Sequence, residues 1–121
     1  MSGKLTTHVL DTAHGCPAKG IAIALWQLDT NLELDFKTLI HTVNTNDDGR
    51  TDEPLLVGET FKTGVYELIF SVGDYFAQYS EASAPLFLDR IPIRFGISDP
   101  EAHYHVPLLV SPWSYSTYRG S

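Results

Sequence analysis

Apolar and polar residues alternate along much of the chain with the two-residue period of a β-strand that buries one face. Residues 5–10 and 66–72 show this pattern most clearly. In the first segment the two faces are Leu5, Thr7 and Val9 against Thr6, His8 and Leu10. In the second, an inward face of Tyr66, Leu68, Phe70 and Val72 opposes Glu67, Ile69 and Ser71. Each segment therefore predicts a half-buried strand.

Five further segments are rich in β-prone and apolar residues and lie between turn-forming residues, which also predicts strands. They are residues 20–28, 34–43, 91–97, 103–110 and 115–118. Within 34–43, the expected faces are Leu34, Phe36 and Ile40 against Asp35, Lys37, Leu39 and His41. Pro92 and Pro107 lack the amide proton that a ladder needs, so we expect them on edge strands, at strand ends or at bulges.

Residues 74–84 form the single helix that the pattern predicts. Asp74 can cap its N-terminus, Phe76 and Tyr79 share a face, and Pro85 stops it. Short strands at regular intervals with one short helix indicate an all-β fold, an antiparallel β-sandwich of about eight strands in two sheets. No repeat or linker interrupts the sequence, so we expect residues 1–121 to form a single domain.

Composition narrows the classes of function. The chain has 121 residues, of which 43% are hydrophobic, and this is enough material for a core. A net charge of −7 without any Lys/Arg cluster argues against a nucleic-acid partner. The longest apolar runs are far shorter than the ~20 residues that span a bilayer, so no membrane partner is expected. Cys16 is the only cysteine and no apolar signal segment follows Met1, which favours a cytoplasmic protein.

Four residues are candidates for chemistry: His8, Arg50, and the pair His103 and His105. Alternate residues of a strand share a face, so the two residues of the pair lie about 7 Å apart along it. Arg50 follows the strong turn formed by residues 46–49. An imidazole can activate water and a guanidinium can hold an anionic or carbonyl-rich substrate. The plainer interpretation is that His8 is a hydrogen-bonded strand residue, that Arg50 is a solvated turn charge, and that His103 and His105 face water.

A metal centre and a covalent nucleophile are both disfavoured by the sequence. Three histidines would suit zinc, but neither an HExxH motif nor a cysteine pair is present, and no carboxylates cluster near the histidine segments. Cys16 has no base beside it and no Gly-x-Ser-x-Gly motif occurs. We therefore expect a site without metal or cofactor.

The C-terminus is unusual for a chain end, where small polar residues ordinarily fray. It reads YSTYRGS, which is β-prone up to Arg119 and Gly120. We expect this tail to be docked as a strand, so that its side chains can line a site.

Three segments of the sequence resemble the corresponding segments of a known protein family. LTTHVLDTAHGCPAKGIAIALW, NDDGRTDEPLL and HYHVPLLVSPWSYSTYRGS closely resemble the transthyretin-like 5-hydroxyisourate hydrolases, in order and over essentially the whole chain. The resemblance implies that His8, Arg50 and His105 are catalytic and that His8 and Arg50 also bind substrate. In that family the tail's Tyr118 and Ser121 line the same pocket, whereas His103 is not among the expected catalytic residues.

The resemblance also implies a reaction and an assembly. Water would open the six-membered ring of 5-hydroxyisourate at an acyl–nitrogen bond, giving 2-oxo-4-hydroxy-4-carboxy-5-ureidoimidazoline, an early step of urate catabolism. One histidine would take the proton of water and the other would orient water or protonate the departing nitrogen, and the sequence leaves these two roles open. The family forms homotetramers, as dimers of dimers, with the sites in channels between dimers, so a partner subunit can complete each site.

Two alternatives remain on the sequence alone. The same fold could serve as a carrier that binds an aromatic anion in the channel, although a carrier of apolar aromatics would favour aliphatic residues there over histidines and arginine. A purely structural β-sandwich would leave His8, Arg50 and His105 far apart in space.

Overall fold

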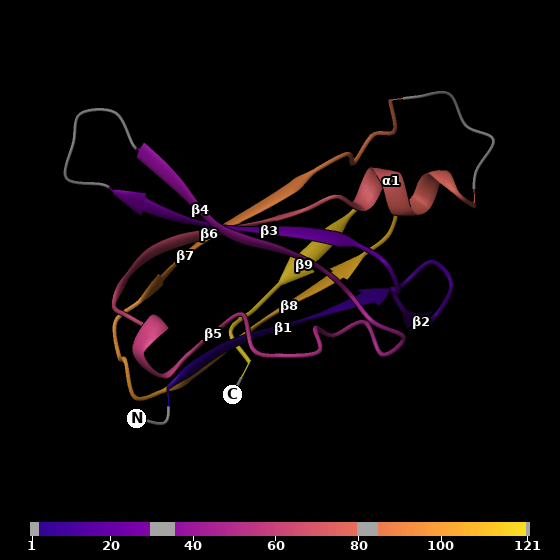
Figure 1. Cartoon of the computed structure of the whole chain (residues 1–121). Coiled ribbons are helices and arrows are strands. Elements are labelled where there is room, and N and C mark those ends of the chain that lie inside the picture. The colour runs from indigo at the N-terminus through magenta and orange to yellow at the C-terminus, as the bar shows by residue number, and fades with distance from the viewer. Residues whose placement is uncertain (1–2, 30–35, 80–84, 121) are drawn as a thin grey trace.

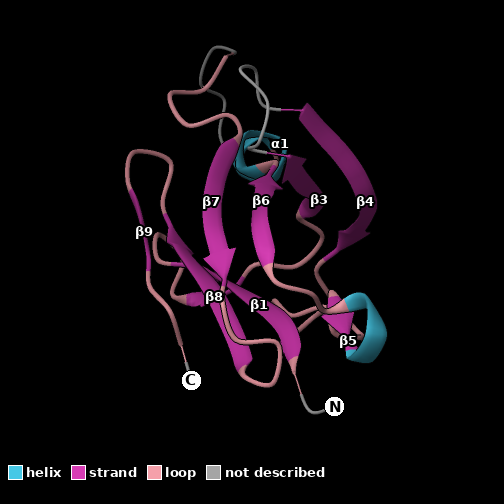
Figure 2. Ribbon diagram, turned by 90° about the vertical axis from the view of Figure 1, so that its left-hand side faces the viewer, coloured by secondary structure: helices cyan, strands magenta, loops and turns pink. Residues whose placement is uncertain are grey.

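The computed structural model describes residues 3–29, 36–79 and 85–120 and arranges them as two facing β-sheets with a short helix at one end (Figures 1 and 2). The first sheet contains both terminal strands. Its members are β1 (Lys4–Asp11), β2 (Cys16–Pro17), β5 (Leu56–Val57), β8 (His103–Val110) and β9 (Tyr115–Thr117). Their order is β2-β1-β8-β9, with β5 also paired to β1.

The second sheet is a four-stranded layer in the order β4-β3-β6-β7. Its strands are β3 (Ala22–Asp29), β4 (Phe36–Asn44), β6 (Gly64–Phe70) and β7 (Ile91–Ile97). A 3₁₀ turn, η1 (Gly58–Thr60), and one helix, α1 (Val72–Ala77), complete the described elements. The predicted β-sandwich is confirmed.

The core forms from the inward faces that the alternation predicts. On β1, Leu5 and Val9 are fully buried, as are Leu68 and Phe70 on β6. The intervening residues of β1 are only half-buried. This leaves the outer face of β1, with Lys4, Thr6 and His8, available for chemistry.

The pair β1 and β8 departs from the antiparallel pattern of the rest of the sandwich, because its two strands run parallel. They lie near opposite ends of the chain, so no hairpin sets their relative direction. Their register places Lys4 beside His103, Thr6 beside His105 and His8 beside Pro107. The outer-face residues of the two strands therefore form adjacent rows.

The bounds of helix α1 differ from those of the predicted helix. It begins at Val72, not Asp74, and ends at Ala77, while residues 80–84 of the predicted span lie outside the described residues. Val72, expected as the last inward residue of a strand, is instead the fully buried first residue of the helix. The Gly73 amide donates to the Asp89 carbonyl at 2.8 Å and holds this turn against the following segment. Strand alternation therefore ends at Phe70.

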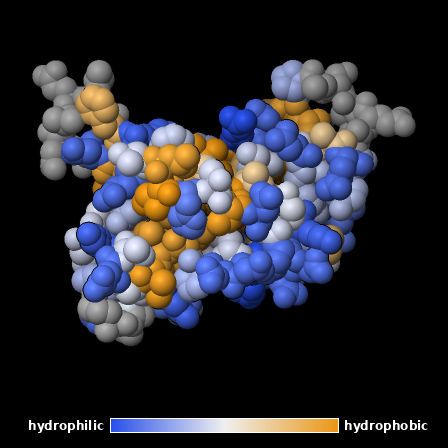
Figure 3. Space-filling model, in the orientation of Figure 1, coloured by the Kyte–Doolittle hydropathy of each residue, from blue (hydrophilic) through white to orange (hydrophobic). Residues whose placement is uncertain are grey.

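Strand β4 also differs from the simple alternation. His41 lies opposite Leu25 and Leu39 lies opposite Trp26, so Ile40 is an extra residue in a β-bulge. The bulge breaks the predicted face of Phe36 and Ile40, and both side chains are exposed, as is Leu39. Residues 34 and 35 lie outside the described residues. Figure 3 shows apolar side chains gathered on this side of the molecule, around β4 and β5.

The two prolines occupy different positions. Pro92 lies on β7, an edge strand, as predicted. Pro107 lies inside β8, between β1 and β9, and pairs with His8 without a register shift, which corrects the expectation of an edge strand, a strand end or a bulge. The ladder from β8 to β9 starts only at Leu108 and resumes as an isolated bridge at His105, so it is interrupted at the proline. Thr117 Oγ1 donates to the Pro107 carbonyl at 2.7 Å across this gap.

The C-terminal tail is docked as predicted. Tyr115, Ser116 and Thr117 pair with Val110, Leu109 and Leu108, and Gly120 then bridges to His105. Among the described helices, none has the length and apolar character to cross a membrane.

Candidate active site

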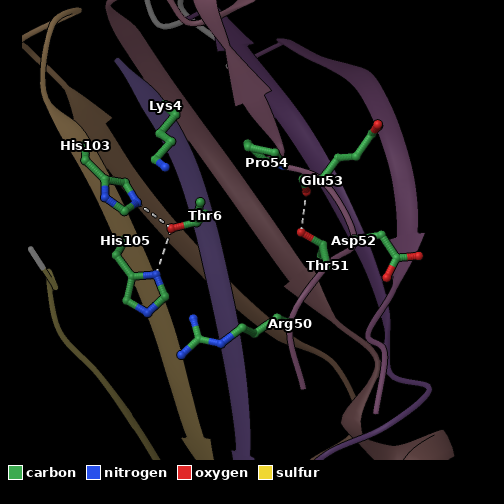
Figure 4. A pocket seen from close by; sticks show the side chains of 9 residues that line it. All are labelled: Lys4, Thr6, Arg50, Thr51, Asp52, Glu53, Pro54, His103 and His105. Atoms are coloured by element: carbon green, nitrogen blue, oxygen red, sulfur yellow. Dashed lines mark hydrogen bonds between the residues drawn. The ribbon is translucent and has the colours of Figure 1, made fainter. Parts of the chain in front are cut away.

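A cavity of about 450 Å³ opens on the outer face of the first sheet (Figure 4). Three segments line it: β1, β8, and the chain that follows the turn at residues 46–49. The lining residues are Lys4, Thr6, Arg50, Thr51, Asp52, Glu53, Pro54, His103 and His105.

Thr6 lies between the two histidines of β8. Its Oγ1 is 2.7 Å from His103 Nε2 and 2.8 Å from His105 Nδ1. The parallel register explains this contact, because Thr6 pairs with His105 and the ring of His103 reaches across from two residues earlier. The three side chains therefore form one hydrogen-bonded row at the wall of the cavity (Figure 4).

Arg50 reaches the site because its turn is attached to β1. Asn46 Oδ1 accepts hydrogen bonds from the amides of Asp48 and Arg50 at 2.9 and 3.2 Å, which closes the turn. Gly49 has φ of +74° and packs so closely on the Val9 carbonyl that a Cβ atom would collide with it. The turn thus delivers the Arg50 guanidinium toward His105, as Figure 4 shows.

His8 lies at the edge of the same cluster. Its backbone forms an isolated bridge with that of Arg50, and its ring centroid is 6.5 Å from that of His105. It is not among the residues that line the cavity of the single chain. Even so, the structure brings His8, Arg50 and His105 together from β1, a turn and β8.

Burial and nearby cations keep these imidazoles neutral. Burial lowers the pKa of His105, and Arg50 lowers it further, with smaller effects from His103 and His8. The pKa of His8 is lowered by burial and then by Arg50, although a contact with Asp48 opposes this. The pKa of His103 is lowered by burial and then by Lys4. All three rings can therefore accept a proton at neutral pH.

The structure adds residues that the sequence did not single out. Thr6 and Lys4 belong to the site, and the period of two that placed Thr6 on the face of His8 is the signal that could have found them. His103 contacts the same hydroxyl as His105, although it was not expected to be catalytic. Asp52 and Glu53 line the cavity, so carboxylates do lie near the histidines.

Residues of the C-terminal tail line a second cavity. Tyr118 lines this cavity of about 250 Å³, together with Ile93, Phe95 and Tyr104, and its own side chain is 60% exposed. The Arg119 guanidinium lies over the ring of Tyr104, 4.2 Å from its centroid. Ser121 lies outside the described residues. Within one chain, then, the tail approaches the histidine cluster through Gly120 alone among the described tail residues.

Possible ligands of a metal ion in this chain are its histidine, cysteine and acidic side chains. Within residues 3–29, 36–79 and 85–120, no group of three or more histidine, cysteine or acidic side chains is arranged to hold one. The chemistry offered by these residues is that of proton transfer by imidazole and charge stabilisation by guanidinium.

The chain is thus a β-sandwich that carries histidines and an arginine on the outer face of the sheet containing β1 and β8. A profile of the HIUase/Transthyretin family matches residues 5–120. The chain belongs to this family.

Individual relatives agree with this assignment. The chain is 57% identical to 5-hydroxyisourate hydrolase 2 of Rhizobium meliloti over 121 residues, covering 99% of this chain and 98% of the relative. A crystal structure of (S)-allantoin synthase superposes with a TM-score of 0.88 at 52% identity, covering 98% of this chain but 44% of that longer chain. Sea bream transthyretin in complex with thyroxine superposes with a TM-score of 0.83 at 28% identity, covering 97% of this chain and 94% of that one.

Proposed function

We propose that this chain hydrolyses 5-hydroxyisourate in urate catabolism, at the cluster of His8, Arg50 and His105. It belongs to the enzyme branch of its family, since relatives with more than half of its residues identical are 5-hydroxyisourate hydrolases. The observation that carries the site is the convergence of two imidazoles of lowered pKa on one guanidinium. The longer allantoin synthase is not a guide to further activities of this chain, which spans less than half of it.

The reaction follows from what these groups can do. His105, which lines the cavity, takes a proton from water as the water oxygen attacks a ring carbonyl of the substrate. Arg50 donates paired hydrogen bonds to the carbonyl edge and stabilises the negative charge that develops on the attacked oxygen. The acyl–nitrogen bond then breaks, and the nitrogen takes up the proton that His105 removed from water, relayed through the second imidazole, which is neutral before and after the step. The former carbonyl becomes a carboxylic acid that releases its proton to solvent. We assign this second role to His8, which lies beside the cavity.

The tail and the assembly complete the proposal. Trp113, Phe87, Tyr115 and Tyr118 are large apolar or aromatic side chains that stay exposed in the single chain. Phe87 and Trp113 lie beside each other, with ring centroids 6.0 Å apart, and contiguous exposed apolar groups are typical of a surface that another protein covers. We propose a homotetramer, a dimer of dimers, in which Tyr118 and Ser121 of one subunit border the substrate pocket of another. This also accounts for the outward position of Tyr118.

A carrier function is the less favoured alternative. Sea bream transthyretin, with thyroxine bound, shares the fold, but at 28% identity it is more distant than the hydrolases. The cavity of this chain is lined by histidines and by charged side chains of both signs, which suits a polar substrate better than an apolar carrier ligand.

The direct test is an absorbance assay with freshly generated 5-hydroxyisourate. The wild-type protein should accelerate its decay, whereas His105→Ala and Arg50→Ala should each be severely impaired. General acid–base catalysis supplies about 10²–10⁴-fold, which sets the expected loss for His105→Ala. Lys19→Ala is a matched control for lost positive charge, because Lys19 is exposed and its ion pair is with the exposed Asp47 of the turn at residues 46–49. Wild-type rates in folded His105→Ala would overturn the assignment.

A further inference from the structure

The hydroxyl of Thr6 joins two imidazoles, and this restricts where their protons can be. A threonine hydroxyl has one proton to donate and two lone pairs that accept. Both ring nitrogens lie within 2.8 Å of it, so both contacts are hydrogen bonds. With both rings neutral and both bonds satisfied, Thr6 donates to at most one ring and accepts from the other.

The position of Arg50 selects between the two arrangements. A guanidinium has only donors, so a ring nitrogen that faces it is more stable as a bare acceptor than as an N–H group. Figure 4 shows the second nitrogen of His105, Nε2, on the side away from Thr6 and toward Arg50. A bare Nε2 requires the proton of neutral His105 to be on Nδ1. His105 then donates to Thr6, and Thr6 donates to His103 Nε2.

We propose that Thr6 and His103 are positioning residues that hold His105 in the tautomer with its proton on Nδ1, leaving Nε2 free to take the proton of water. The arrangement resembles the logic of a nucleophile–histidine–carboxylate triad, in which a third group fixes the tautomer and orientation of the base. Here the hydroxyl of Thr6 takes the place of the carboxylate, and the neutral imidazole of His103 accepts the hydrogen bond that Thr6 donates. This inference rests on the proposed role of His105 as the base.

The charged groups around His103 and His105 are consistent with this order of hydrogen-bond donors. The pKa of His103 lies below its ordinary value through burial and the charge of Lys4, so its ring is neutral and has a bare nitrogen to offer Thr6. The groups of the cluster that can exert charge on His105 are His8, Arg50 and His103, and the same cavity is also lined by Lys4, Asp52 and Glu53. When His105 gains its second proton, the Thr6 oxygen continues to accept from Nδ1 and stabilises the imidazolium.

The first test compares Thr6→Val with Thr6→Ser. Valine keeps the shape and removes the hydroxyl, so kcat should fall about 10–100-fold with little change in KM, because the base is misoriented while Arg50 remains. Serine restores the hydroxyl and should recover most of the lost turnover. Thr42→Val is the matched control, since Thr42 is an exposed threonine of β4 on the other sheet. Equal activity of Thr6→Val and wild type would overturn the proposal.

The second test reads the tautomer directly. In protein labelled with ¹⁵N-histidine, the imidazole nitrogen shifts of His105 should report an Nδ1–H tautomer in the wild type and a shift toward Nε2–H in Thr6→Val. A role of Thr6 in packing alone would lower stability without moving the tautomer. An Nε2–H tautomer in the wild-type protein would reject the proposed direction of the hydrogen bonds.

A double-mutant cycle separates this inference from the proposed function. If Thr6 and His103 act through one chain, Thr6→Val/His103→Ala should lose little more turnover than either single variant, because the effects of coupled residues are not additive. Additive losses would contradict the chain. If His105→Ala is itself fully active, the proposed function of the site fails; if only Thr6→Val is fully active, this inference alone fails.

Discussion

Gly120 lies directly against His105: its amide donates a 2.7 Å hydrogen bond to the His105 carbonyl, and a Cβ atom at position 120 would lie 2.8 Å from His105 Cδ2. The imidazole thus occupies the space that any other side chain would require. The C-terminal tail is therefore one wall of the position that His105 adopts, even though the tail has its own short strand, β9.

Gly120→Ala should therefore impair hydrolysis by displacing either the tail or the imidazole. Contacts below 3.0 Å cannot be accommodated without movement, and misplacement of a catalytic group by about 1 Å can cost about 10²-fold in rate. We expect kcat to fall by about that factor while the thermal midpoint changes little, because the tail end is largely exposed. Steady-state kinetics and thermal unfolding of the purified variant measure both quantities.

Gly96→Ala provides the control for this substitution. Gly96 lies on β7, and a Cβ atom there would meet nothing within 4 Å. Its kinetics should match those of the wild type. Undiminished turnover in Gly120→Ala would show that the tail does not set the position of His105.

The strands could be predicted from the sequence because their signal is local. Alternation of apolar and polar side chains over a few residues depends only on which face is buried. It correctly placed Tyr66, Leu68 and Phe70 on the inward face of β6 and gave β1 its two faces. The start of α1 and the bulge at Ile40 depend instead on contacts with distant segments. Gly73 bonds to Asp89, and Leu25 sets the register opposite His41. No local pattern contains that information.

Some residues of the candidate site could likewise be predicted from the sequence, and others could not. His8, Arg50 and His105 could be proposed because their residue types and their family motifs are visible in the chain. The role of Thr6 could not, because it depends on the parallel register of β1 and β8, which places Thr6 beside His105 from 99 residues away. The position of Tyr118 could not be predicted either. The ladder between β9 and β8 covers Tyr115 to Thr117 and is interrupted at Pro107, so Tyr118 does not continue it.

The pH dependence of the reaction should reflect imidazoles of lowered pKa. The base must be neutral, and burial and Arg50 hold the pKa of His105 below 6.5. Activity should therefore be level near neutral pH and fall only as the pH drops below about 6.5 toward the lowered pKa. The pH profile of kcat/KM for the wild-type enzyme measures this limb.

Arg50→Gln gives the comparison for that profile. Removing the positive charge should raise the pKa of His105, so the acid limb of the residual activity should move to higher pH.

The stability of the wild-type protein should also decrease at acid pH. The folded state binds protons less readily than the unfolded chain, so the free energy of unfolding should decrease as the pH falls below 6.5. An acid limb above pH 6.5 in the wild type would contradict the lowered pKa values.

Chelation should leave the reaction unaffected. Imidazole and guanidinium supply the proton transfer and charge stabilisation that the hydrolysis needs, so prolonged dialysis against a chelator should not reduce turnover. The measurement is the initial rate before and after dialysis, with added zinc as a further sample. Loss of activity that zinc restores would show that the cluster works through a metal ion.

Deleting residues 118–121 should abolish hydrolysis while costing little stability. The described part of this tetrapeptide contacts the rest of the chain through the cation–π pair of Arg119 with Tyr104, worth about 0.5–1 kcal/mol at an exposed site, and through the Gly120–His105 hydrogen bond, worth about 0.5–1.5 kcal/mol. Tyr118 is 60% exposed, so its burial in one chain adds little more. The effect on turnover should be far larger, because the deletion removes the Gly120 contact that confines the His105 ring and, in the proposed tetramer, the side chains that border a neighbouring site. Arg119→Ala separates the two consequences: it removes the cation–π contact but keeps Gly120 in place, so it should share the small loss of stability and retain most of the turnover. The thermal midpoint, the oligomeric state in solution and kcat of the two variants decide the matter. A fully active truncated protein would remove the tail from the active site, and a truncated protein that no longer folds would show that the tetrapeptide contributes mainly to stability.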